Sequence, residues 1–416
     1  MNPNKPFGAM CSEAHSAAAR QIAGEGMVLL RNENHTLPIE LTQRPTILVV
    51  GENAIKMMTV GGGSSSLKAK YEISPLQGIQ ERAEGLAEVK YVRGYVGDIG
   101  GEYNGVTTGQ SLQDDRTPEQ LTAEAVEAAK SADYVVFVGG MNKAHNQDCE
   151  DGDRLHYELP YAQDQLISAL AAVNDKVIFV SISGNAHGMP WNQEVEAILQ
   201  AWYSGSETGH AVADVLFGDV NPSGKLPYTI QPTLADYPAH QYGEEAYPGV
   251  DKQVYYKEDI FVGYRYADLY GTRKPIKYVS QGKQYTINPP KHQALFPFGF
   301  GLSYTTFEYS KATLNGNQIT VSITNTGNRA GQEVVQLYIT DSKASVVRPK
   351  KELKGFSKVA LLPGETKQVT FTITPDMLSY FDADAHHWIA EEGLFVIHIA
   401  SSSTDIHASL PYNYKK

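Results

Sequence analysis

The sequence contains almost no cysteine, with only Cys11 and Cys149 among 416 residues. Two cysteines cannot build a disulfide framework, so a hydrophobic core has to hold the fold together. There is also no apolar run long enough to cross a bilayer. The formal net charge of -12 argues against nucleic acid as a partner. The first residues are polar and include proline, unlike a signal peptide, so the cellular location stays open.

Metal and nucleotide motifs are missing as well. Five acids lie between residues 148 and 158. If Gly152 were the glycine of an EF-hand loop, the acid positions before it would hold Gln147, Cys149 and Asp151, so that pattern fails. A single cysteine does not make a zinc site. The glycine-rich stretches "VVGENA" and "VGGGSSS" match neither the dinucleotide fingerprint nor the P-loop. Taken alone, the acid-rich loop is typical of a solvated surface loop.

The first half of the chain alternates apolar strands with helices. Ser12 is a plausible N-cap for one helix, and Thr117 with Gln120 forms a capping box at the start of another. We expect helices over 12–26, 117–132, 161–173 and 209–227, a helical turn near Trp191, and strands over 45–50, 88–94, 134–140 and 176–182. A short apolar run covers 27–32, and the stretch "AILQAWYSG" covers 197–205. Such alternation predicts an α/β sandwich, a mostly parallel sheet with helices on both faces.

Ligands of such sheets bind beyond the carboxyl ends of the strands. Three loops are expected at that edge: residues 60–66, the acid-rich loop after 134–140, and "SGNAHGMPW" after 176–182. Each of these three loops is therefore a candidate for part of a binding site.

The second half has a different pattern. Residues 231–304 are rich in proline, glycine and aromatic rings, and we expect an ordered connecting segment because so many rings need burial. From residue 305 apolar and polar residues alternate between glycine, asparagine and proline turns. This pattern predicts an all-β, immunoglobulin-like sandwich over 305–416. The predicted domains are therefore 8–230, 231–304 and 305–416, after a short linker remnant over 1–7.

Eight stretches resemble, in order, family 3 glycoside hydrolases, the β-glucosidase and β-xylosidase family. Residues 12–39, 61–79, 150–167 and 218–230 resemble its second domain, 260–268 and 296–310 its link to the last domain, and 325–341 and 352–373 its fibronectin type III-like domain. The resemblance covers nearly the whole chain. It implies a hydrolase acting on O-glycosyl bonds and implies no cofactor and no metal.

The resemblance also implies site residues. In that family an E-G-x-D-R pattern followed by L-x-L-P carries the general acid/base on its glutamate, and "EDGDR" puts Glu150 there. Asp151 replaces the usual glycine. A like charge beside Glu150 would raise its pKa, which suits a proton donor at neutral pH. Asp153 and Arg154 are expected to brace the acid/base loop.

The glycine-rich loop gains a role from the same resemblance. In the family this loop lies near the substrate, and Ser64 and Ser65 are the matching candidates for sugar contacts. A bare flexible turn remains an equal alternative. Trp191 and Trp202 are expected in the core, because a tryptophan beside a sheet is more often buried than stacked on a ligand.

Retaining glycosidases need two carboxyl groups about 5–5.5 Å apart. In the resembled family the nucleophile is an aspartate in an S-D-W motif on an N-terminal TIM barrel, and the 416 residues contain no such motif. We therefore expect the C-terminal part of a retaining β-glycosidase that hydrolyses terminal β-linked glucose or xylose, inactive by itself. Its expected partners are a β-linked glycoside and a barrel domain or chain, with self-association through an uncovered apolar face.

Two other functions stay open. The first is a non-catalytic carbohydrate-binding or structural module that complements a separate barrel chain. A nucleotide-dependent enzyme is a weaker alternative, because the phosphate-binding motifs are absent.

Overall fold

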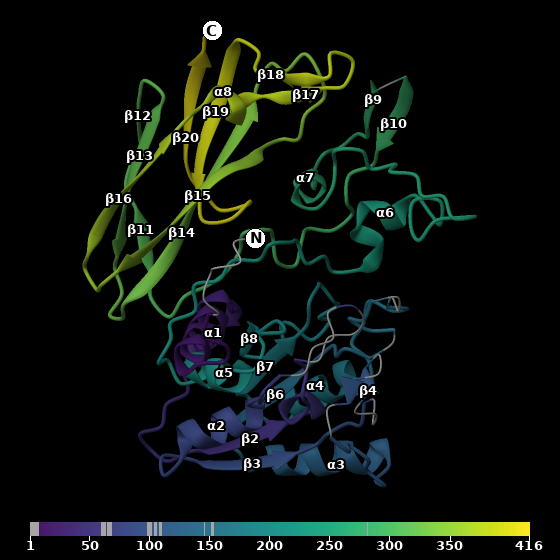
Figure 1. Ribbon diagram of the computed structural model, residues 1–416, viewed down its shortest axis with the longest axis vertical. Helices are drawn as coiled ribbons and strands as arrows, with labels where there is room; N and C mark the ends of the chain where they lie inside the picture. The colour runs from purple at the N-terminus through teal and green to yellow at the C-terminus, as the bar shows by residue number, and fades with distance from the viewer. Residues whose placement is uncertain are drawn as a thin grey trace. The chain divides into compact units, whose positions relative to one another are not determined.

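The computed structural model describes residues 8–59, 64, 69–97, 102–103, 106–107, 110–144, 146–150, 154–280 and 282–416. The chain divides into two compact units, Met1–Gly224 and Lys225–Lys416, which Figure 1 colours from purple to yellow. The division at 230 and 304 stays a prediction. Within the described residues, no helix has the length and apolarity needed to cross a membrane.

A six-stranded sheet forms the centre of the first unit. Its strands are β1 (Val28–Asn32), β2 (Thr46–Val50), β3 (Glu88–Val92), β6 (Tyr134–Gly140), β7 (Val177–Ile182) and β8 (Ala197–Gln200). They lie in the order β1-β8-β7-β6-β2-β3. Every neighbouring pair is parallel except β1 with β8. The strands β6, β7 and β8 are buried along their whole length, which confirms the predicted mostly parallel sheet.

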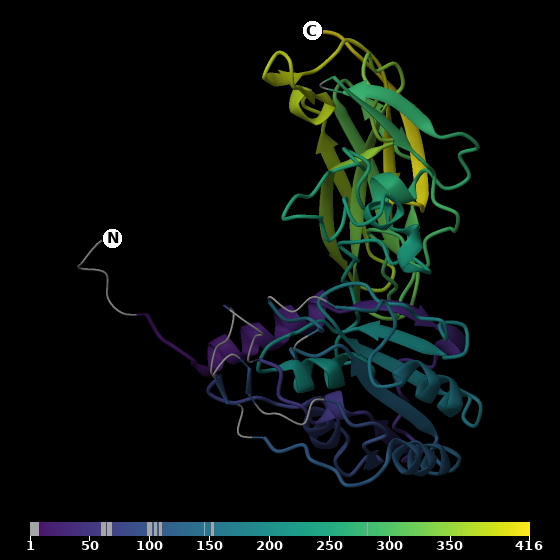
Figure 2. The same cartoon turned by 90° about the vertical axis from the view of Figure 1, so that its right-hand side faces the viewer.

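Five helices cover this sheet: α1 (Glu13–Gly26), α2 (Pro75–Ala83), α3 (Pro118–Ala129), α4 (Gln163–Ala171) and α5 (Thr208–Leu216). Helices α1 and α2 pack on α5, and α3 packs on α4. Because parallel crossovers are right-handed, the change of direction after β3 sends α2 and α3 to opposite faces. Figure 2 shows helices on both sides of the strands. The strand order therefore reverses between β2 and β6, where sheets of this kind bind ligands.

The local signals placed two helix starts correctly. The Ser12 hydroxyl accepts a hydrogen bond from the His15 amide at the start of α1, and Thr117 and Gln120 form the predicted capping box of α3. The prediction for 209–227 is wrong at its end: α5 stops at Leu216, and Gly218 follows with a φ of 79°. Near Trp191 the chain forms turns of the helical i→i+3 type, in which the Asn192 amide donates to the Met189 carbonyl oxygen at 3.1 Å and the Glu194 amide to that of Trp191 at 2.8 Å, as predicted.

Two packed sheets form the sandwich of the second unit (Figure 1). One holds β11 (Phe307–Tyr309), β12 (Thr313–Asn315), β13 (Gln318–Asn325) and β16 (Thr366–Thr372), and the other holds β14 (Gly331–Asp341), β15 (Glu352–Leu361), β19 (Gly393–Ala400) and β20 (Ile406–Tyr414). Every strand pair is antiparallel. Buried side chains alternate along β13 and supply the core from both sheets. The predicted all-β sandwich is confirmed.

The segment before the sandwich has a small core of its own, made by Phe261, Tyr266, Leu269 and Ile287. It is therefore ordered, as its ring content predicted.

The remaining elements are short: η1 (Glu33–His35), η2 (Glu52–Ala54), β4 (Glu102–Tyr103), β5 (Val106–Thr107), η3 (Leu234–Asp236), α6 (Pro238–Gln241), α7 (Tyr264–Ala267), β9 (Ile276–Ser280), β10 (Lys283–Ile287), α8 (Pro375–Leu378), β17 (Tyr380–Asp382) and β18 (His387–Ile389).

A buried histidine holds the loop after β7. The His187 side chain is fully buried, with Nε2 2.9 Å from the Ser181 hydroxyl and Nδ1 2.8 Å from the Gly188 carbonyl oxygen. The carbonyl can only accept, so Nδ1 carries the hydrogen of a neutral ring. Burial lowers the pKa of His187 from 6.5 to about 4.

This histidine should make the first unit sensitive to acid. Below pH 6.5 the unfolded chain takes up a proton that the folded chain refuses until about pH 4, so stability is lost across that interval. The loss should reach about 3 kcal/mol at its end. Hydrogen exchange of the β7 amides, corrected for intrinsic rates, measures it. A His187→Gln variant should lose less stability over the same interval; an identical pH slope in both proteins would contradict this assignment.

Candidate active site

The reversal of strand order brings two loops together. The loop that leaves β2 and the loop that leaves β6 start side by side, because these strands are parallel neighbours. The Asn53 side-chain amide donates a hydrogen bond of 2.9 Å to the Met141 carbonyl oxygen and ties the two loop bases together. Both residues are buried. The crevice that such folds use for ligands is therefore present at this edge of the sheet.

Two of the predicted site residues meet where these two loops extend beyond the sheet. The backbone amide of Ser64, on the glycine-rich loop, donates a hydrogen bond to the Glu150 carboxylate, on the acid-rich loop, across 86 residues of chain. Both side chains are exposed. A solvated carboxylate with a fixed amide donor beside it is able to exchange a proton with a bound molecule.

The expected direction of the Glu150 pKa is wrong for this structure. Hydrogen bonds from the Ser64 amide and hydroxyl lower the pKa of Glu150, because they stabilise the charged carboxylate. Nothing buries the group enough to oppose this. Asp151, whose charge was expected to raise the pKa, lies outside the described residues.

The acid-rich loop is anchored by Asp148, which the sequence reading took for a surface acid. Its carboxylate accepts hydrogen bonds from the Gly184 amide at 2.7 Å, the Asn185 side chain at 2.9 Å and the Tyr203 hydroxyl at 2.9 Å. These donors come from the loops after β7 and β8. The Lys143 ammonium also lies 3.9 Å from the centre of the Tyr203 ring. Asp148 thus joins three loops two residues before Glu150.

Of the residues expected to brace this loop, the structure describes Arg154. It donates a hydrogen bond of 2.7 Å to the Ala186 carbonyl oxygen, again on the loop after β7. Its bracing role stays a prediction. Asp153, and Ser65 on the glycine-rich loop, lie outside the described residues.

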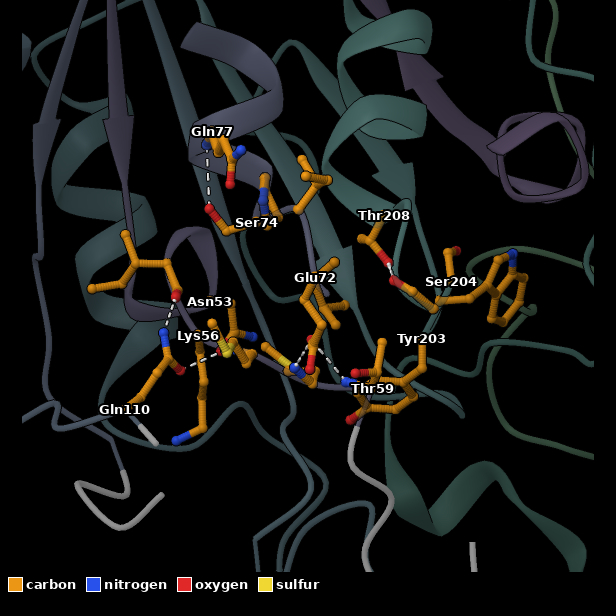
Figure 3. Close-up of a pocket in the computed structure, with 18 residues that line it drawn as sticks. Asn53, Lys56, Thr59, Glu72, Ser74, Gln77, Gln110, Tyr203, Ser204 and Thr208 are labelled. Carbon is orange, nitrogen blue, oxygen red and sulfur yellow. Dashed lines mark hydrogen bonds between the residues drawn. The ribbon is translucent and has the colours of Figure 1, made fainter. Parts of the chain in front are cut away.

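The glycine-rich loop is clamped where it begins. One carboxylate oxygen of Glu72 accepts the backbone amides of Met58 at 2.9 Å and Thr59 at 3.0 Å, as Figure 3 shows. Gln110 accepts the Met57 amide at 2.8 Å and donates to the Ile55 carbonyl oxygen at 2.7 Å. Neither residue was predicted, because each acts on backbone groups far away in sequence.

A buried charge network lies beneath this clamp. The Glu52 carboxylate accepts hydrogen bonds from Arg93 and from the Gly97 amide, both at 2.7 Å, and lies 3.4 Å from the Lys56 ammonium. Glu52, Arg93 and Lys56 are all buried. Since a buried charge without a partner is costly, removing any one of them should destabilise the loop base.

A cavity of about 140 Å³ lies between the clamp and the loop after β8. Lys56, Glu72, Trp202 and Tyr203 are among its lining residues (Figure 3). Trp202 is therefore not a core residue as expected, but a partly exposed wall. Trp191 is fully buried, and its indole donates a hydrogen bond of 2.7 Å to Asp164, so that expectation is confirmed.

The carboxylates of this edge differ in what they are free to do. Glu52, Glu72 and Asp148 hold backbone amides or buried cations, whereas Glu150 touches the Ser64 loop from an exposed position. Among the described residues, no group of three histidine, cysteine or acidic side chains is arranged to hold a metal ion. The geometry suits proton transfer by one carboxyl group.

Comparisons with known proteins bear on this geometry. Residues 27–264 match the family described as "Glycosyl hydrolase family 3 C-terminal domain", and residues 333–403 match "Fibronectin type III-like domain". The chain is 45% identical to "Beta-glucosidase BoGH3A" of Bacteroides ovatus, covering 100% of this chain and 54% of that protein. It is 39% identical to "Thermostable beta-glucosidase B" of Acetivibrio thermocellus, covering 95% and 48%.

A solved structure gives the same result. The crystal structure of a Bifidobacterium adolescentis GH3 beta-glucosidase superposes with a TM-score of 0.81 at 33% identity, covering 99% of this chain and 54% of that one. The chain therefore spans about half the length of the relatives that it matches.

The anchoring role of Asp148 predicts a loss of stability. Asp148→Ala removes a charged acceptor from three donors on two neighbouring loops and should cost about 1–3 kcal/mol. Urea unfolding combined with hydrogen exchange of residues 146–150 measures the effect. The matched control is Asp175→Ala at an exposed acid, which should change stability by less than about 0.5 kcal/mol. Equal urea midpoints for the two variants would count against the anchor.

Proposed function

Because the chain belongs to the glycosyl hydrolase family 3 C-terminal domain family, we propose that it supplies the general acid/base of a retaining β-glycosidase. The substrate class is a glycoside with a terminal β-linked glucose or xylose. The two relatives described above are named beta-glucosidases, which favours glucose.

One observation carries the proposal. Glu150 and Ser64 were chosen from separate motifs, and their loops meet at the reversal of strand order, where a ligand has access to both. Glu52, Glu72 and Asp148, at the same edge, are engaged in holding the loops. Of these four acids, Glu150 is thus the one best able to change its protonation state during a reaction.

The role of Glu150 follows from the chemistry of retention. As an acid it protonates the departing glycosidic oxygen, and as a base it then removes a proton from the attacking water. A second carboxylate, on a barrel that the 416 residues do not include, forms the bond to the sugar. Ser64 holds Glu150 and contacts the sugar. Ser65 contacts the sugar, and Asp153 and Arg154 brace the acid-rich loop.

A proton donor needs a higher pKa than Glu150 has when exposed. Desolvation raises the pKa of a carboxyl group, so a barrel that covers the loop would supply the missing effect. The Ser64 hydrogen bonds oppose it and keep the carboxylate ready for the second step.

The second unit offers a surface that such a barrel could cover. Between residues 247 and 262 the side chains of Tyr247, Val250, Val254, Tyr255, Tyr256 and Val262 are exposed. Large exposed apolar patches mark interaction sites. We propose that the barrel covers this patch, and that without it the chain self-associates there.

The first functional prediction is that the chain alone does not hydrolyse β-glycosides, because a proton donor without a nucleophile gives only part of the rate enhancement. Assays with aryl β-glucosides and β-xylosides test this, before and after a barrel domain carrying S-D-W is fused or added. Turnover should appear with the barrel, and sedimentation should show less self-association. Turnover without a barrel would contradict the proposal that the nucleophile lies on the barrel and the acid/base on this chain. If the chain binds the sugar tightly but shows no turnover after the barrel is added, a non-catalytic module is favoured.

The second concerns Glu150 once the barrel is present. Glu150→Ala should slow substrates with poor leaving groups by roughly 10²–10⁴-fold, since these need the proton most. Activated aryl glycosides should instead be limited by the second step, which lacks a base. Added azide needs no base, so it should restore that step and give a β-glycosyl azide.

Neighbouring acids provide the controls. Asp148→Asn should lower the rate of hydrolysis of all substrates by the same factor, since it disturbs the loop rather than the proton transfer. Added azide should not restore the rate. Asp151→Asn should show no azide rescue either. If Glu150→Ala lowers the rate of hydrolysis of every substrate by the same factor and azide does not restore it, Glu150 is not the acid/base.

A further inference from the structure

The second unit carries a small hairpin with an exposed aromatic pair. Strands β17 and β18 pair antiparallel, and their register places Phe381 directly opposite Trp388. The two rings meet nearly edge to face, with centroids 5.6 Å apart. Phe381 is 50% exposed and Trp388 is 65% exposed. Rings of this size are normally buried, so two exposed rings on a two-stranded hairpin indicate a binding site.

The aromatic pair borders a pocket of about 480 Å³. Its walls come from three parts of the sequence: residues 259–280, residues 346–352 and residues 379–388, which include the β17–β18 hairpin. Figure 1 labels the two hairpins concerned, β9–β10 and β17–β18, in the second unit. The volume lies within the usual range for small-molecule sites.

The two arginines that line the pocket, Arg265 and Arg348, are each paired with acidic side chains. Arg348 lies 2.7 Å from Glu352 and 3.4 Å from Asp341, and Arg265 lies 3.0 Å from Glu352. The Arg348 side chain also donates to the Leu378 carbonyl oxygen at 2.9 Å. A ligand with a negative charge would have to compete with the acids for these arginines, which is costly, and would also face the acidic side chains of Asp382 and Asp384. The pocket therefore disfavours an anionic ligand.

Hydrogen-bonding groups remain at the rim. Asp382 uses one carboxylate oxygen to accept the amides of Asp384 and Ala385, and Asp384 itself is exposed. Both line the pocket beside the aromatic pair. Carboxylates accept hydrogen bonds from hydroxyl groups, and flat ring faces pack against C–H surfaces. A molecule with apolar faces and hydroxyl edges matches both features.

We infer that this pocket binds a short neutral saccharide, whose pyranose rings stack on Trp388 and Phe381 while their hydroxyl groups donate to Asp382 and Asp384. The site lies entirely in the second unit and includes neither Ser64 nor Glu150. It therefore goes beyond the proposed hydrolytic function and does not depend on it. Such a site would hold the chain on a carbohydrate without cleaving it.

Binding to the intact chain tests the inference directly. The probes are cellotetraose, laminaritetraose and xylotetraose, followed by calorimetry. At least one should bind with a dissociation constant on the order of a millimolar. Trp388→Ala should weaken that binding by about tenfold or more, and Trp388→Phe, which keeps a ring, should recover part of it. Asp384→Asn should also weaken it.

The control is Phe356→Ala on β15, because Phe356 is 69% exposed and does not line the pocket. The affinity of the Phe356→Ala variant for the neutral tetrasaccharides should match that of the wild type. Tetragalacturonate, an anionic probe, should not bind more tightly than the neutral ones. The inference is wrong if no neutral tetrasaccharide binds, or if Trp388→Ala binds as well as the wild type. It is equally wrong if Trp388→Ala abolishes only self-association or barrel binding, since the rings then belong to a protein interface.

Discussion

The first unit depends on the reversal of strand order between β2 and β6. Right-handed crossovers send the connections that follow these strands to opposite faces of the sheet, and a crevice opens between the loop bases. Asn53 bridges the crevice through its hydrogen bond to the Met141 carbonyl oxygen. Loops that leave the sheet here are neighbours whatever their sequence separation. The meeting of Ser64 with Glu150 follows from that arrangement.

Carboxylates at this edge do two kinds of work. Glu52 is buried against Arg93 and Lys56, Glu72 holds backbone amides, and Asp148 joins three loops. Such anchors need a permanent negative charge, because a protonated acid would lose acceptor strength towards its donors. Within the part of the chain that the structure describes, Glu150 has no comparable set of contacts, and its side chain is exposed. An acid that must gain and lose a proton in each reaction cycle has to remain outside the anchoring network, since any conformational link would couple catalysis to loop stability.

The pKa of Glu150 shows how strongly a site depends on what covers it. In the exposed loop the Ser64 donors lower this pKa, whereas a general acid at neutral pH requires a raised one. Desolvation acts in the opposite direction from hydrogen bonding, and its size depends on the covering surface. Under the proposed function this chain would present the catalytic group, and the environment contributed by another part of the enzyme would set its proton affinity. The pocket beside Trp388 does not depend on a covering surface in this way, because Arg348 and Arg265 already form ion pairs with Glu352 within the second unit.

Features carried by short-range patterns were determined by the sequence itself. Ser12 and Thr117 cap their helices through neighbours three residues away, alternation along β13 reports which face is buried, and motif order identified the family. The tertiary structure alone decided the rest. Nothing near Asp148 in sequence distinguishes it from other acids of its loop, because its donors lie 36, 37 and 55 residues away. The pocket beside Phe381 likewise needs three distant segments, and only chain folding brings them together.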